Sequence, residues 1–170
     1  KAMNDKPIIF ACANPVPEIY PYEAKEAGAY IIGTGRGDFP NQVNNSLGFP
    51  GILKGALLVR ASKITDNMAI AAAKSLANFA EKRGINPDNI LPTMEEAGVF
   101  PNEAAEVASQ AIADGVARIS MNWDEAYNRA KEDIDYSRNL TNLLMESGFI
   151  KKPPQSLIDE ALEFAIKEVS

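Results

Sequence analysis

Residues 7–13, PIIFACA, form a continuous apolar run in which polar residues do not alternate with apolar ones. An unbroken run of this length is typical of a strand covered on both faces in a parallel sheet. A second apolar stretch, AYIIGTG at residues 29–35, follows a short helical segment in which Gly28 favours a helix end. The order strand, short helix, strand predicts half of a doubly wound α/β fold.

A segment rich in Gly, Pro and Asn follows, GTGRGDFPNQVNNSLGFPG at residues 33–51. These residues favour turns, so we expect a surface loop or broken helix where the second strand ends. Thr65 then suits the N-cap of an alanine-rich helix. We expect this helix to continue to about Arg83 and to end at Gly84.

From about Pro101 onward the apolar residues recur at helical spacing, and a final apolar stripe extends from Leu157 to Val169. The predicted fold class is therefore α/β. We expect part of a doubly wound, Rossmann-like parallel sheet, followed by a helical carboxyl-terminal segment. The sheet part is assigned to residues 1–98, and a helical tail that packs on it to residues 99–170.

Composition and charge restrict the class of partner. The chain of 170 residues is 46% apolar and 24% charged, as in ordinary globular proteins. No apolar run approaches the roughly 20 residues of a membrane helix, and no signal peptide is recognisable, so we expect a cytoplasmic protein with no membrane partner. The formal net charge is −6, and the acidic excess lies in residues 85–170. An acidic second half argues against nucleic acid as a partner.

The chain has no histidine and a single cysteine, Cys12. These counts exclude a Ser-His-Asp or Cys-His nucleophile, a histidine metal site and a disulfide within the chain. Acid–base chemistry would have to use Lys, Tyr, Asp or Glu. Because Cys12 lies in the apolar run, we expect a small, inert core residue.

Three asparagines are the candidate binding residues. Asn14 follows the first strand, and Asn44 and Asn45 lie in the loop after the second strand. In open α/β sheets, ligands bind beyond the carboxyl ends of the strands, and an amide offers donors and an acceptor without a charge. Asparagines beside Pro and Gly are also common turn formers, so both interpretations stay open at this point.

The motif GTGRGD invites comparison with a dinucleotide fingerprint, but its spacing is wrong. Gly33 and Gly35 fit, whereas the third glycine position is Asp38. The fingerprint also belongs on the first strand-to-helix turn, and this strand is at least the second. We expect Arg36 and Asp38 to form an ion pair that shapes the loop.

Three longer segments closely resemble the cofactor-binding domain of malic enzymes, especially the short bacterial and archaeal type. They are PIIFACANPVPEI, AGAYIIGTGRGDFPNQVNNSLGFPGILKGAL and ITDNMAIAAAKSLA. The resemblance covers about residues 3–80, and its specific motifs are ANPxPE and PNQxNN leading into FPG. From about Phe100 onward, the tail is similar to that of some archaeal malate oxidoreductases.

The resemblance implies a role for each asparagine. Asn14 would line the cleft where the nicotinamide ribose meets the substrate, and Asn45 would bind the malate carboxylate. Asn44 would be a neighbouring cofactor contact. The reaction implied is the oxidative decarboxylation of (S)-malate to pyruvate and CO2, with reduction of NAD or NADP and with a Mg or Mn ion.

The other parts of such an active site are expected outside this chain. In the family, the catalytic tyrosine and lysine, the metal ligands and the glycine-rich loop precede the point that matches Lys1. The resemblance therefore implies that the amino-terminal portion of the same enzyme is a partner, and that this chain is inactive alone. Unpaired strand edges further suggest a homo-oligomer. Two alternatives remain: a non-catalytic Rossmann-like binding or assembly module, and another 2-hydroxy acid dehydrogenase.

Overall fold

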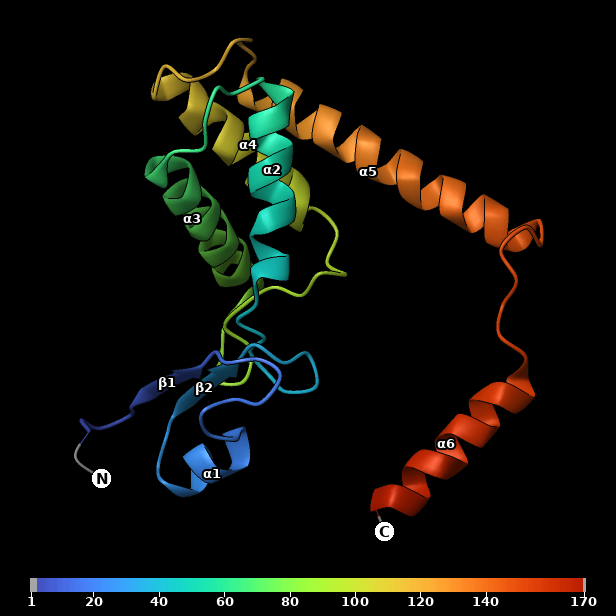
Figure 1. Ribbon diagram of the computed structural model, residues 1–170. Coiled ribbons are helices and arrows are strands. Elements are labelled where there is room, and N and C mark those ends of the chain that lie inside the picture. The colour runs from blue at the N-terminus through green and yellow to red at the C-terminus, as the bar shows by residue number, and fades with distance from the viewer. Residues whose placement is uncertain (1–2, 170) are drawn as a thin grey trace. The chain divides into compact units, whose positions relative to one another are not determined.

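The computed structural model describes residues 3–169 (Figure 1). By its contacts the chain divides into two compact units, Lys1–Lys131 and Glu132–Ser170. The first unit holds a small sheet and a group of packed helices, and the second holds the end of one long helix and a further helix. The division into domains at residue 98 remains a prediction.

The sheet consists of two parallel strands. β1 (Ile8–Ala11) pairs with β2 (Ile31–Thr34), with Ile8 opposite Ile31 and Ala11 opposite Thr34. The connection contains the short helix α1 (Pro21–Glu26). Parallel strands joined by a helix are the repeating unit of doubly wound sheets, so this prediction is confirmed.

The covering of β1 differs from the prediction. Ile8 and Phe10 are 54% and 51% exposed, although the apolar run predicted a strand buried on both faces. Among the described elements, only β2 packs extensively on β1. No other described element packs extensively on the outer side chains of β1, and the free edge of this strand has no strand partner among the described residues.

Three helices form the core of the first unit. They are α2 (Phe49–Leu58), α3 (Asp66–Arg83) and α4 (Val99–Ala113). Thr65 caps α3 by accepting a hydrogen bond from the Met68 amide at 3.2 Å, and Gly84 ends the helix with φ 94°. Both predicted limits of this helix are therefore confirmed.

Helices α2 and α4 lie side by side because α2 presents glycines to α4 (Figure 1). A Cβ atom on Gly55 would lie 2.5 Å from the Ala104 carbonyl oxygen and 2.7 Å from Val107 Cβ. Ala104 and Val107 are themselves fully buried. Since real Cβ atoms do not approach other atoms so closely, this helix spacing requires glycine.

A buried carboxyl group lies at the same contact. Glu103 of α4 is fully buried, and neither of its carboxyl oxygens has a hydrogen-bond partner among the described residues. Burial raises the pKa of Glu103 to about 8, and the Gly51 backbone amide has a smaller, opposite effect. Glu103 is therefore neutral at pH 7.

The rest of the chain is helical, as predicted. α5 (Trp123–Glu146) begins with a capping box, in which the Glu125 amide donates to Asn122 Oδ1 at 2.9 Å and Asn122 donates back at 2.8 Å. Trp123 stacks on Tyr127 with ring centroids 5.2 Å apart.

In the second unit, α6 (Gln155–Val169) carries its large apolar side chains exposed. Tyr136 and Phe149 are 70% and 82% exposed. None of the helices within the described residues is both long and apolar enough to cross a membrane.

Replacing Gly55 with alanine in the full-length protein is expected to lower the free energy of unfolding by roughly 1–3 kcal/mol. The added Cβ has no space between α2 and α4. Chemical denaturation measures the change. The control is Leu57→Ala, at a position on α2 that is 73% exposed, for which we expect a change below about 0.5 kcal/mol. Equal losses in both variants would contradict the close helix contact.

Glu103 is expected to make stability fall as the pH rises. Because its pKa is about 8 when folded and near 4.5 when unfolded, the folded state binds the extra proton between these values. Stability from this group should therefore decrease from pH 5 to pH 8, by up to about 1.4 kcal/mol per pH unit. Denaturation of the wild type and Glu103→Gln across this range measures the difference. If the free energy of unfolding of the two proteins changed with pH in the same way, Glu103 would have to be ionised in the folded state.

Candidate functional site

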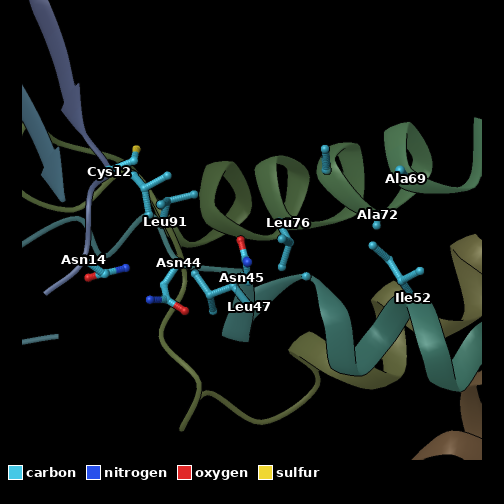
Figure 2. Close-up of a pocket in the computed structure, with 13 residues that line it drawn as sticks. Cys12, Asn14, Asn44, Asn45, Leu47, Ile52, Ala69, Ala72, Leu76 and Leu91 are labelled. Carbon is cyan, nitrogen blue, oxygen red and sulfur yellow. The ribbon is translucent and has the colours of Figure 1, made fainter. Parts of the chain in front are cut away.

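The three candidate asparagines lie together at the carboxyl ends of the parallel strands (Figure 2). They border a cleft of about 460 Å³ between this edge of the sheet and helices α2 and α3. Its lining residues are Cys12, Asn14, Val43, Asn44, Asn45, Leu47, Gly48, Ile52, Ala69, Ala72, Ala73, Leu76 and Leu91. The sheet topology thus unites residues that are about 30 positions apart in the sequence.

Asn14 is held against the loop that follows β2. A Cβ atom on Gly35 would lie 2.5 Å from Asn14 Nδ2, so the amide packs directly on the backbone of that glycine. The Asn14–Pro15 peptide is cis, and Pro15 accepts a hydrogen bond from Arg36 Nη1 at 3.3 Å. The adjacent loop residues Gly35 and Arg36 thus hold the Asn14 side chain and the proline that follows it.

The ion pair predicted in this loop is present. Arg36 donates to both carboxyl oxygens of Asp38, at 2.8 Å and 2.6 Å. The guanidinium hydrogen bonds lower the pKa of the Asp38 carboxyl, although both side chains are accessible to water. Because Arg36 also contacts Pro15, the pair ties the loop after β2 to the segment after β1.

Asn44 uses its amide within the chain. Its Nδ2 donates to the Gly35 carbonyl oxygen at 2.8 Å, and its Oδ1 accepts from the Ser46 amide at 3.0 Å. The second bond caps the short 3-10 helix η1 (Asn45–Leu47). Asn44 therefore supports the loop, and its role as a cofactor contact remains a prediction.

Asn14, after β1, and Asn45, after β2, differ from Asn41 and Asn44. Their side chains are exposed in the cleft and have no hydrogen-bond partner among the described residues. Asn41, by contrast, is 7% exposed, donates to Ile32 and Pro87 and accepts from the Ile90 amide. The cleft thus contains two amides available to a ligand, and the other two asparagines are engaged in the fold.

Cys12 was predicted to be a buried core residue, and this prediction is wrong. The strand β1 ends at Ala11, so Cys12 belongs to the segment that leaves the sheet. Its side chain is exposed and borders the cleft (Figure 2). The apolar run in the sequence extends two residues beyond the strand, and therefore it did not mark the strand end.

Sequence reasoning missed the apolar wall of the cleft. Leu47, Ile52 and Leu76 come from η1, α2 and α3 and lie along it (Figure 2). Leu47 lies in the segment for which a surface loop or broken helix was predicted, and no role was predicted for Ile52 or Leu76. An apolar wall with a few amides suits a ligand that has both a ring and polar groups.

The described residues do not provide a metal site. Between residues 3 and 169 there is no group of three or more His, Cys, Asp or Glu side chains that could hold a metal ion. The polar groups of the cleft are neutral amides, which suit hydroxyl, amide and carboxylate groups of organic ligands.

Parallel strands joined by a helix, with free amides beyond their carboxyl ends, define part of a Rossmann-like nucleotide-binding domain. Residues 1–118 match the family model described as the malic enzyme NAD binding domain. The chain therefore belongs to the malic enzyme family, of whose NAD-binding domain it forms a part.

Individual relatives agree with this assignment. The bifunctional malic/malolactic enzyme of Bacillus subtilis is 46% identical over 132 residues, which is 78% of this chain and 32% of that protein. The crystal structure of Entamoeba histolytica malic enzyme is 66% identical with a TM-score of 0.95, covering 99% of this chain and 35% of that one. The malic enzyme from Pyrococcus horikoshii is 46% identical, with a TM-score of 0.78 over 84% of this chain and 32% of that one. The chain spans about a third of the length of these relatives.

Replacing Gly35 with alanine in the full-length protein is expected to displace the Asn14 amide, because the new Cβ would lie 2.5 Å from Nδ2. The side-chain amide resonances of Asn14 in NMR spectra, or a crystal structure, report the displacement. Gly37→Ala is the matched control, since its Cβ would meet only the flexible end of Gln42 at 3.1 Å. An unmoved Asn14 in Gly35→Ala would contradict the packing described.

Proposed function

We propose that the protein containing this chain is an NAD- or NADP-dependent malic enzyme. It would oxidatively decarboxylate (S)-malate to pyruvate and CO2, and this chain alone would be inactive. The observation that carries the proposal is the pair of free amides, Asn14 and Asn45, in a cleft at the carboxyl ends of the strands. Membership of the malic enzyme family supports it further.

The two amides are suited to hold a hydroxy acid in a fixed orientation. Asn45 Nδ2 donates a hydrogen bond to a carboxylate oxygen of malate, and Asn14 contacts the substrate and the nicotinamide ribose. When bound, the nicotinamide ring supplies the hydride acceptor. The apolar side chains of Leu47, Ile52 and Leu76 exclude water from one side of the cleft.

Asn44 is proposed as a cofactor contact with a supporting role. Its Nδ2 already donates to Gly35, and its Oδ1 accepts from Ser46. It can therefore hydrogen-bond to the cofactor only through its second amide hydrogen or the second lone pair of its oxygen. This arrangement would orient the Asn44 side chain before the dinucleotide binds. Its loss would therefore disturb both the loop and the cofactor.

The Mg or Mn ion of the proposed reaction does not fit the residues described for this chain. No suitable cluster of carboxylates exists among them. Its ligands, together with the catalytic tyrosine and lysine, are proposed to belong to the amino-terminal portion of the same enzyme. That portion would complete the active site by closing the cleft from the side of the sheet edge.

Two further properties belong to the proposal. We propose a homo-oligomer, supported by exposed apolar residues on α6, namely Leu157, Leu162, Phe164 and Ile166. We also propose a cytoplasmic protein with no nucleic acid or membrane partner, supported by the single cysteine and the net charge of −6.

Asn45→Ala in the full-length enzyme is expected to raise KM for malate or lower kcat by about 10- to 100-fold. The variant loses one or two hydrogen bonds to a charged carboxylate. Steady-state kinetics with malate and either dinucleotide provide the measurement. The matched control is Asn128→Ala, an exposed asparagine on α5 outside the cleft, which should keep wild-type kinetics.

A substrate panel tests the proposal against other functions. Turnover of lactate or glutamate in preference to malate would indicate a different dehydrogenase. No turnover of any of these acids by the full-length protein would indicate a binding or assembly module. Unchanged malate kinetics in Asn45→Ala would remove Asn45 from the site.

A further inference from the structure

The start of helix α2 lacks a capping side chain of its own. Its N-cap residue is Gly48, which has no side chain, and its second residue is Pro50, which has no backbone N–H. The Gly51 amide lies in the first turn, where helix amides have no intrahelical acceptor. Within α2 the Gly51 amide therefore has no acceptor.

Glu103 of α4 occupies the space beside this turn. A Cβ atom on Gly51 would lie 2.1 Å from Glu103 Oε2, so the carboxyl packs directly on the backbone of α2. The group is fully buried, and neither carboxyl oxygen has a hydrogen-bond partner among the described residues. A buried carboxyl without a partner costs stability, and the Gly51 amide is the backbone group that acts on this one and lowers its pKa.

Only one layer of backbone separates Glu103 from the cleft. Gly48 lines the cleft, and a Cβ on it would lie 3.9 Å from Glu103 Oε1. The Gly48 amide in turn donates to the Asn45 carbonyl oxygen at 3.0 Å. The first turn of α2 is therefore joined through Gly48 to Asn45, whose side-chain amide is free.

We propose that Glu103 is a positioning residue for Asn45. From α4 its carboxyl group packs against the Gly51 backbone in the first turn of α2, and it thereby fixes the turn that presents the Asn45 amide to the substrate. The inference rests on the proposed function, because it assigns Asn45 to the binding of malate. It adds a residue that is outside the cleft and that touches neither substrate nor cofactor.

The chemistry of the site suits this role. Burial raises the pKa of Glu103 to about 8, so the group is neutral at pH 7. A neutral carboxyl can contact the Gly51 amide without adding a negative charge close to the proposed binding site of an anionic acid. Methionine would fill the same space without a strong acceptor, and glutamine would keep a neutral acceptor of the same shape.

The test compares Glu103→Met and Glu103→Gln in the full-length enzyme, with KM for malate, KM for the dinucleotide and kcat measured separately. We expect Glu103→Met to raise KM for malate about fivefold or more, with KM for the dinucleotide within about twofold of wild type. Glu103→Gln should restore malate binding to within about twofold of wild type. The control is Val107→Ala, which loosens the same helix pair at Gly55 and should leave both KM values unchanged.

Each outcome separates the role of Glu103 from the proposed function. A wild-type enzyme that does not turn over malate would overturn both. An active wild type with unchanged kinetics in Glu103→Met, or with equal effects in Val107→Ala, would overturn the positioning role alone. If Glu103→Met does not fold, Glu103→Leu gives the same test, because leucine also fills the space without a hydrogen-bond acceptor.

Discussion

The close contact between α2 and α4 is the constraint on which the cleft depends. Gly51 and Gly55 bring the backbone of α2 against Glu103, Ala104 and Val107, at distances that no larger residue allows. Because η1 continues directly into α2, the end of this contact at Gly51 and Glu103 lies next to the turn that carries Asn45. The residue proposed to bind malate therefore lies beside the packed start of α2, and residues on rigid elements are held more precisely than residues on free loops.

The asparagines that follow the two strands have different physical roles. Asn41 and Asn44 satisfy backbone groups around β2 and η1, and these bonds give the loop a single conformation. Asn14 and Asn45 have no such bonds among the described residues, and both face the cleft. An amide without a partner at the carboxyl end of a parallel strand is available for a ligand, whereas an engaged one is part of the scaffold.

Several exposed apolar side chains fit a chain that spans about a third of its relatives' length. Ile8 and Phe10 lie on a strand with a free edge, and α6 carries a further apolar group. Exposed apolar surface of this extent marks sites of contact with other protein. The amides, the apolar wall and the loop lie within the described residues, among which no cluster of His, Cys, Asp or Glu could hold a metal ion.

Local features of the sequence determined the elements of this protein. The strand, helix, strand order, the cap at Thr65, the stop at Gly84 and the Arg36–Asp38 pair depend on neighbouring residues, and all were predictable. Cys12 was placed wrongly because the end of a strand depends on where its partner strand ends. Only the tertiary structure decided which asparagines are free and that Glu103 is buried. Both facts depend on contacts between segments far apart in the chain, and a pattern of neighbouring residues does not record such contacts.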